Sequence, residues 1–177
     1  MRCTILFLGF LLMFCTLALS QNSGNPHFFK LLIMNQKQEI LLIDFDGSWE
    51  IPGSCYKMDS TIPVFLDEMA LDHGVKIQND RLVALVTFHH EVRDLPTMMF
   101  YYTADYFSGN LKTPSWGRNV QWFKLQDAYE IIPFKEMVHI IKSIQKQNDL
   151  LSGALKIKYD QNGKRTGEYE VLDALKD

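Results

Sequence analysis

The sequence predicts an α+β protein in which helices cover a mixed β-sheet. Three observations favour this class: short apolar runs of strand length, two segments with apolar residues at intervals of three and four, and turns rich in Gly, Asn and Pro between them. The 177 residues suit one globular domain with a single sizeable core. Hydrophobic residues make up 47% and charged residues 22%, so neither a disordered chain nor a multispanning membrane protein is indicated.

Residues 1–20 have the pattern of a secretory signal peptide. Arg2 precedes an apolar run over 5–19, and Ala18 and Ser20 are the small residues expected before a cleavage site that follows Ser20. The run is short for a bilayer, which needs ~20 apolar residues, so we expect no stable membrane insertion after cleavage. An uncleaved N-terminal anchor is the alternative. The segment predicts a secreted or periplasmic protein.

The net charge and the cysteine content exclude several classes of partner and of active site. The formal net charge is -3, and loss of Arg2 with the signal segment leaves 17 basic against 21 acidic residues, or -4. This balance argues against a nucleic acid polymer or an anionic lipid surface as partner. Cleavage also removes Cys3 and Cys15, so Cys55 is then the only thiol and no internal disulfide is possible. Because no histidine partner for Cys55 is indicated, a catalytic thiol is disfavoured.

The first two strands are expected over 28–34 and 40–45. Residues 35–38 form a link so short that only an antiparallel hairpin fits, and 46–48 form another turn. An amphipathic helix follows from Thr61 to Gly74, because its apolar positions recur at helical spacing: Ile62, Phe65, Leu66, Met69, Ala70 and His73. Thr61 suits an N-cap, Pro63 is tolerated in the first turn, and Gly74 suits a C-cap.

The second half of the chain gives the same kinds of signal. Expected are a hairpin of strands over 82–88 and 98–106, a loop over 108–119, a strand over 120–125, a helix over 134–147, and a last hairpin over 154–172 that turns at Asn162-Gly163. We assign 27–150 to the main domain and 151–177 to a C-terminal hairpin extension that covers a sheet edge.

Acidic residues beside the first helix form the strongest candidate site. Glu68 and Asp72 are four residues apart, so their carboxylates lie on one helix face. Such a pair suits Mg²⁺, which commonly binds one or two carboxylates together with substrate phosphates and water. Asp59 joins them if the preceding loop folds back. A solvated helix face without function is the alternative, because surface helices are routinely charged.

The order of residues from Trp49 to Val75 then resembles the signature of the Nudix hydrolase family. That signature is glycine, five residues, glutamate, seven residues, then Arg-Glu-hydrophobic-x-Glu-Glu-x-Gly-hydrophobic. Gly53 followed by five residues reaches Asp59, and seven more reach Asp67 without a gap. The resemblance covers roughly 28–146 and implies a Nudix-like α/β/α sandwich with a mixed sheet.

The resemblance also implies roles for single residues. Glu68 falls on a metal-binding glutamate, Asp72 on the last acid, which the family uses for metal and as general base, and Asp59 on a shortened first glutamate. This signature, called the box below, is degenerate in the present sequence. Asp67 stands where the family has an arginine, and Leu71, which cannot coordinate a metal, stands where it has its middle metal-binding glutamate.

Two functions follow as expectations. The first is an exported, Mg²⁺- or Mn²⁺-dependent hydrolase of a diphosphate linkage in a nucleoside diphosphate-linked compound, in which Glu68 and Asp72 face a common cleft near Gly53. The second is a catalytically impaired module that binds a nucleotide, a glycan or a protein. Substrate-binding residues are not fixed, although Trp116 or Phe107 in the long loop could stack on a ligand.

A second metal site is conceivable at His89-His90-Glu91. Adjacent residues of a strand point to opposite faces, so at most one of these histidines could share a site with Glu91. A polar cluster at the end of a strand is the simpler interpretation.

Overall fold

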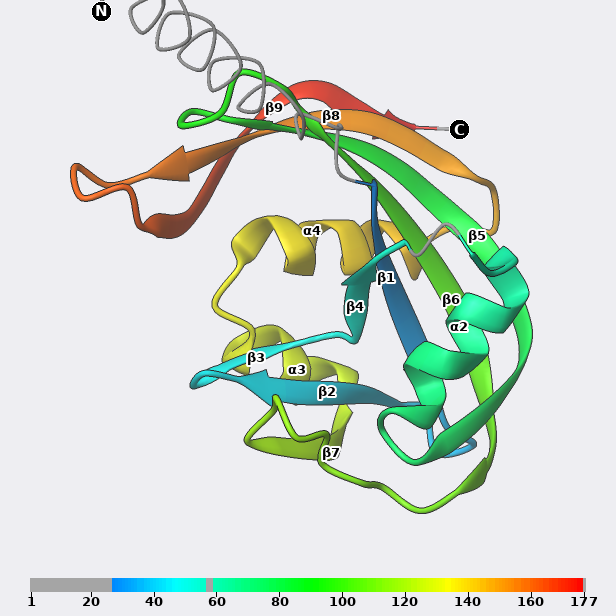
Figure 1. Ribbon diagram of the computed structural model, residues 1–177. Helices are drawn as coiled ribbons and strands as arrows, with labels where there is room; N and C mark the ends of the chain where they lie inside the picture. Colours follow the sequence, from blue (N-terminus) through cyan, green and yellow to red (C-terminus); the bar gives the residue numbers. More distant parts are fainter. Residues whose placement is uncertain (1–26, 57–58, 177) are drawn as a thin grey trace, which may run out of the picture.

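The computed structural model describes residues 27–56 and 59–176. The predicted signal peptide lies outside these ranges. In the described residues no helix is long and apolar enough to cross a membrane. The elements, labelled as in Figure 1, are β1 His27–Met34, β2 Glu39–Phe45, β3 Ser48–Glu50, β4 Gly53–Cys55, α2 Ile62–Leu71, β5 Val75–His90, β6 Thr97–Gly109, β7 Asn119–Lys124, α3 Leu125–Ile131, α4 Lys135–Ile144, β8 Leu151–Tyr159 and β9 Arg165–Lys176.

The strands form one mixed, curled sheet. Its order is β3-β2-β1-β6-β5-β8-β9, with β4 paired to β1 and β7 paired to β2. Two pairs, β1 with β6 and β5 with β8, are parallel, and the others are antiparallel. The long strands β5 and β6 curve around the molecule, with α2 on one side of the sheet and α3 and α4 on the other (Figure 1). This layering confirms the predicted α+β sandwich.

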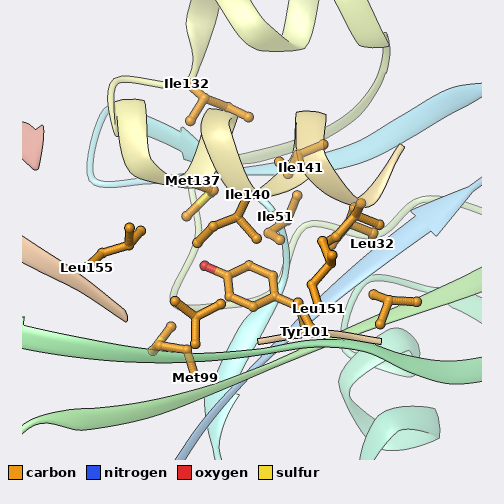
Figure 2. Close-up of a cluster of buried hydrophobic side chains, with 14 of the residues drawn as sticks. Leu32, Ile51, Met99, Tyr101, Ile132, Met137, Ile140, Ile141, Leu151 and Leu155 are labelled. Atoms are coloured by element: carbon orange, nitrogen blue, oxygen red, sulfur yellow. The ribbon is translucent and has the colours of Figure 1, made fainter. Parts of the chain in front are cut away.

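Side chains of the central strands point alternately to the two faces of the sheet, and each face carries its own hydrophobic core. In β1, Leu32 joins the core beneath α3 and α4, whereas Leu31 and Ile33 join the core beneath α2. Successive side chains of a strand point to opposite faces, so a run that is apolar throughout is buried on both. Figure 2 shows the first of these cores, in which the ring of Tyr101 lies among side chains of α4 and the sheet.

Helix α2 is fixed on the sheet by four buried side chains, Phe65, Leu66, Met69 and Ala70. Thr61 occupies the predicted N-cap position, although its side chain makes no capping hydrogen bond. Gly74 adopts a φ of +79°, and a Cβ there would lie 2.1 Å from the carbonyl oxygen of Asn110. The C-cap is Asp72, so the prediction of Gly74 as the C-cap is wrong. Gly74 instead lies in the turn between α2 and β5, where only glycine fits without a shift of the backbone.

Most of the predicted elements are confirmed, with strand ends that extend further than expected. The β5 and β6 strands continue from Val75 to His90 and from Thr97 to Gly109. The final hairpin is also present, and β8 pairs with the open edge of β5. Helix α3 and the short strands β3 and β4 were not predicted, because seven or three residues carry too little periodicity to separate them from loops.

Candidate functional site

A cavity of about 450 Å³ lies beside the C-terminal end of α2, and we call it the α2 cavity. Its walls come from β1, β2, the segment from β3 to β4, α2 and the loop before β7. The lining residues are Phe28, Lys30, Ile43, Phe45, Glu50, Gly53, Ser54, Cys55, Met69, Asp72, His73 and Trp116. The chain thus brings Gly53, the glycine of the signature, and the C-terminal end of α2 to one cavity.

A buried ion pair forms part of the wall of the α2 cavity. Lys30 Nζ donates to Glu50 Oε2 at 2.6 Å and to the carbonyl oxygen of Ile51 at 3.2 Å. Burial lowers the pKa of the Lys30 ammonium, while the neighbouring Glu50 carboxylate opposes this shift. The pair therefore presents a desolvated cation that one protein carboxylate already compensates.

Gly53 allows the backbone to lie directly against this pair. In the ladder between β1 and β4, Gly53 is opposite Lys30. A Cβ at this position would lie 2.6 Å from Lys30 Cδ and 2.8 Å from Phe28 Cε1. Any larger residue would displace the Lys30 side chain from Glu50, which gives the glycine of the box a packing role.

Asp72 and His73 close the cavity at the end of α2. Asp72 is exposed, whereas His73 is buried and neither of its ring nitrogens has a hydrogen-bond partner. Burial lowers the pKa of the His73 imidazole to about 4, although the Asp72 carboxylate acts in the opposite direction. The imidazole is therefore neutral at pH 7, and its ring meets Trp116 edge-on with centroids 5.6 Å apart.

The other predicted acids lie next to this cavity rather than in its wall. Glu68 and Asp59 line a separate groove together with Ser60, Thr61 and Val64. The structure thus brings Glu68 and Asp59 together, while Asp72 faces the cavity at Gly53. Glu68 and Asp72 thus line different hollows, the groove and the α2 cavity. Asp67 and Leu71, the two departures from the box, are exposed.

The carboxylates near α2 suit a metal ion that is bound partly by protein and partly by substrate, rather than one bound by protein side chains alone. Over residues 27–56 and 59–176, no group of three His, Cys, Asp or Glu side chains is placed to hold an ion. Mg²⁺ often binds through one or two carboxylates and completes its octahedron with substrate phosphates and water. The exposed Asp72 carboxylate, which has no ion-pair partner among the described residues, fits that mode.

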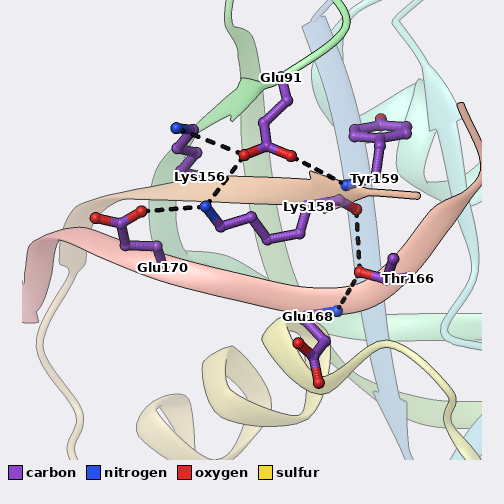
Figure 3. Close-up of polar contacts among 7 residues, drawn as sticks. All are labelled: Glu91, Lys156, Lys158, Tyr159, Thr166, Glu168 and Glu170. Atoms are coloured by element: carbon purple, nitrogen blue, oxygen red, sulfur yellow. Dashed lines mark hydrogen bonds and ion pairs between the residues drawn. The ribbon is translucent and has the colours of Figure 1, made fainter. Parts of the chain in front are cut away.

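In the structure His90 and Glu91 have different protein partners at the end of β5, as in the polar cluster that was the simpler interpretation. His90 Nδ1 lies 2.8 Å from the Tyr159 hydroxyl, whereas Glu91 turns to the lysines of β8. Figure 3 shows this network, in which the Glu91 carboxylate bridges Lys156, Lys158 and the backbone N–H of Tyr159. Its role is to fasten the C-terminal hairpin to the end of β5.

Two residues of the cavity were missed by sequence reasoning. Lys30 is the only charge in the apolar run of β1, and Glu50 is the last residue of β3. A lone cation inside a strand that is otherwise buried was the available signal, because such a charge needs a partner. Of the two aromatic candidates in the long loop, Trp116 lines the cavity, and Phe107 is exposed and does not line it.

Solved structures share this arrangement of strands and helices. The mutator MutT protein from Bacillus halodurans superposes with a TM-score of 0.67 at 16% identity, over 83% of this chain and 97% of that one. A NUDIX hydrolase from Nitrosomonas europaea gives 0.64 at 13% identity, over 77% and 81%. The chain has the Nudix fold. The resemblance read from Gly53 to Val75 is thereby confirmed at the level of the fold.

A third Nudix-fold structure was solved with a nucleotide ligand. The NUDIX domain of Shewanella oneidensis NrtR, complexed with ADP ribose, gives a TM-score of 0.61 at 13% identity, over 71% of this chain and 89% of that one. Comparison of the sequence with protein-family models and with curated proteins finds no match. The likeness is thus one of fold.

Proposed function

We propose that the protein hydrolyses a diphosphate linkage in a nucleoside diphosphate-linked compound. The observation that carries the proposal is the position of Asp72 in a Nudix fold, where it faces the same cavity as Gly53 and the Lys30–Glu50 pair. An exposed carboxylate without an ion-pair partner among the described residues can hold a divalent cation, which joins it to the phosphates of the substrate. The ADP ribose bound by the NrtR domain is a compound of the proposed class.

Residues of the α2 cavity would orient the substrate. Lys30 supplies a positive charge in a wall shielded from water, where attraction to a phosphate is stronger than in bulk solvent. Phe45 and Trp116 lie at the cavity with ring centroids 6.1 Å apart and are both about half exposed. They offer apolar faces on which the non-phosphate part of the substrate stacks.

Mg²⁺ or Mn²⁺ would be held in the α2 cavity by Asp72 together with phosphate oxygens and water. When bound, the ion neutralises charge on the diphosphate. Asp72 also takes the proton from the attacking water as the new bond from oxygen to phosphorus forms and the bridging oxygen leaves. Glu68 and Asp59 line the separate groove, where the two carboxylates would share a further divalent ion.

Hydrolysis is tested by incubating the chain with a panel of diphosphate compounds and Mg²⁺ or Mn²⁺. Turnover should stop with a chelator and fall by about 10²-fold or more in Asp72→Asn, because loss of a positioned base typically costs that much. Glu68→Gln should fall less. Asp67→Asn is the matched control, since Asp67 is an exposed acid of the same helix that lines neither the α2 cavity nor the groove. Equal turnover in wild type and Asp72→Asn would refute the proposal.

The departures from the box favour a second candidate, a binding module without turnover. Leu71 stands where the family has a metal-binding glutamate, and its side chain is 51% exposed. Calorimetry with ADP-ribose and related nucleotides separates the two functions. A module would bind these compounds with equal affinity in wild type and Asp72→Asn, and would release no hydrolysis product.

We also propose that the protein acts outside the cytoplasm, because residues 1–20 have the pattern of a secretory signal. Expression of the full chain in a secreting host, followed by N-terminal sequencing, tests this. A mature protein that begins at Gln21 is expected. Retention of Met1 on a membrane-bound product would favour the anchor instead.

A further inference from the structure

A second cavity, of about 180 Å³, lies on the α4 side of the sheet beneath the C-terminal hairpin. We call it the hairpin cavity. It is lined by Phe28, Lys30, Glu50, Phe88, His90, Arg93, Thr97, Met99, Tyr101, Met137 and Arg165. Phe28, Lys30 and Glu50 also line the α2 cavity, so the two hollows meet at the buried ion pair.

Buried polar atoms without partners gather around the hairpin cavity. The Tyr101 hydroxyl and the Thr97 hydroxyl have no hydrogen-bond partner, although their side chains are 0% and 5% exposed. Arg165 Nε is also without one. Leaving a buried donor unpaired costs about 1–3 kcal/mol. Three such groups at one small hollow offer donors to a ligand that accepts hydrogen bonds.

Charges around the cavity leave an excess of one positive charge. Lys30 is paired with Glu50, and Arg165 is paired with the fully buried Glu136. Arg93 has no carboxylate partner among the residues that the structure describes. An incoming group with one negative charge would therefore be compensated.

The histidine of the cavity adds no charge of its own. Burial lowers the pKa of the His90 imidazole to about 4, and the positive charges of Arg93 and Arg165 act in the same direction. His90 is therefore neutral at pH 7. Its depressed pKa agrees with a positive potential in the hollow.

The guanidinium of Arg165 is held in place before any ligand arrives. Its central carbon lies 4.4 Å from the ring centroid of Phe134 and 6.0 Å from that of Phe88. Together with the Glu136 contact, these rings fix a donor that is carried by β9, outside the main domain predicted from the sequence. A preorganised donor loses little freedom on binding.

From this arrangement we infer that the hairpin cavity binds an oxyanion, a phosphoryl or carboxylate group, through Arg93, Arg165 and the Tyr101 hydroxyl. The hairpin cavity adjoins the α2 cavity, where hydrolysis is proposed, so a group bound in it can belong to the same substrate molecule. The inference therefore rests on the proposed function and specifies its substrate class. The substrate is a diphosphate-linked compound that carries a further anionic group on the part not attacked. The volume suits one such group and not a second nucleotide.

Calorimetric titration of the full chain with inorganic phosphate, and separately with acetate, tests the site. No divalent ion is present, and the ionic strength is held with NaCl. Tyr101→Phe is the most informative variant, because it removes a hydroxyl that has no partner and so should not destabilise the fold. Its dissociation constant for phosphate should rise about tenfold, the loss of one hydrogen bond to a charged group.

Arg93→Gln should raise the same constant to a similar extent, whereas Arg118→Gln should leave it unchanged. Arg118 is also an exposed arginine, but it pairs with Asp46 and lines neither cavity. Unchanged phosphate affinity in both Tyr101→Phe and Arg93→Gln would overturn the inference, as would failure of the wild type to bind either anion.

Asp72→Asn separates this inference from the proposed hydrolysis. Phosphate binding should persist in that variant, even if no compound is turned over. Markedly tighter phosphate binding in Asp72→Asn, from removal of a neighbouring negative charge, would place the anion in the α2 cavity and overturn the inference alone. If turnover exists, a diphosphate compound with a terminal phosphate should be preferred over its dephosphorylated form, and Arg93→Gln should abolish the preference. If Arg93→Gln kept the wild-type preference for the phosphorylated compound, the cavity would bind only free anions, and the proposed substrate class would be refuted.

Discussion

Gly74 shows how one backbone conformation positions the site. Its positive φ and its contact with the Asn110 carbonyl set the direction in which the chain leaves α2. We predict that Gly74→Ala lowers the free energy of unfolding by about 2 kcal/mol or more, from the left-handed conformation together with the steric overlap. Urea unfolding followed by circular dichroism measures the change.

Gly163 is the matched control for this substitution. It has a φ of +73°, but a Cβ there would meet nothing within 4 Å. Gly163→Ala should therefore cost only the conformational part, about 1 kcal/mol. Equal losses in the two variants would contradict the steric role of Gly74.

His73 gives a prediction about pH. Its pKa is about 4 in the fold and near 6.5 when unfolded, so the unfolded chain binds more protons between these values. Stability must therefore fall as the pH drops from 6.5 to 4, with at most about 3 kcal/mol attributable to His73. His73→Phe should show a smaller fall over that range. Parallel curves for the two proteins would contradict the prediction, since His90 contributes equally to both.

Site residues whose positions follow from local sequence spacing could be predicted, whereas those brought to the site by tertiary contacts could not. Asp72 and Gly74 were placed by helical periodicity and by the box. Lys30 and Glu50 meet across twenty positions of sequence, and the pairings of β1 with β2 and β4 and of β2 with β3 bring their segments together. The separation of Glu68 from the α2 cavity likewise depends on how the loop before α2 folds, which no periodicity encodes.

At the scale of elements, the contact between α4 and β9 joins the C-terminal hairpin to the domain. Arg165 reaches Glu136, which is completely buried in the first turn of α4. Lys135 and Glu168 form a second pair between the same elements, but both side chains are about two thirds exposed. The buried pair should dominate, because solvent screens the exposed one.

We predict that Arg165→Met destabilises the protein by about 3 kcal/mol, since it leaves the Glu136 carboxylate buried without a partner. Adding Glu136→Leu should restore most of the loss. Lys135→Met, the control at the exposed pair, should change little. Thermal and urea unfolding of the four proteins give the comparison. A double variant as unstable as Arg165→Met alone would show that the cost does not come from the unpaired carboxylate.

Element prediction succeeded where length and periodicity agreed. The helices at α2 and α4 and the hairpins of β1 with β2 and β8 with β9 were expected from the sequence. Helix α3 follows β7 without a break, and its seven residues contain no Gly or Pro to mark the junction. The expected strand over 120–125 and the helix over 134–147 therefore left it out.

At the scale of the whole molecule, the C-terminal hairpin belongs to the main sheet. Strand β8 pairs in parallel with β5 from Ala84–Leu151 to His90–Ile157. Leu151, Leu155 and Ile157 are fully buried in the core beneath α4. A parallel pairing across such a sequence separation carries no local signal, so the sequence indicated a hairpin but not its place in the sheet.

We predict that a chain ending at Leu150 does not fold cooperatively. Removing three buried aliphatic side chains at about 2–5 kcal/mol each would exceed much of a typical stability of about 5–15 kcal/mol. Circular dichroism should show no sharp thermal transition, and the protein should aggregate. A truncated chain that melts cooperatively near the temperature of the full chain would establish residues 151–177 as a separable extension.

The ion pair between the two cavities has a consequence for how they are occupied. Lys30 divides its interaction between Glu50 and whatever enters from either side, so a ligand in one hollow alters the field met by a ligand in the other. The two binding equilibria are then energetically linked, and linkage is reciprocal: each ligand must change the affinity of the other by the same factor. An anion bound in the hairpin cavity would thus change the affinity of the α2 cavity for a diphosphate ligand.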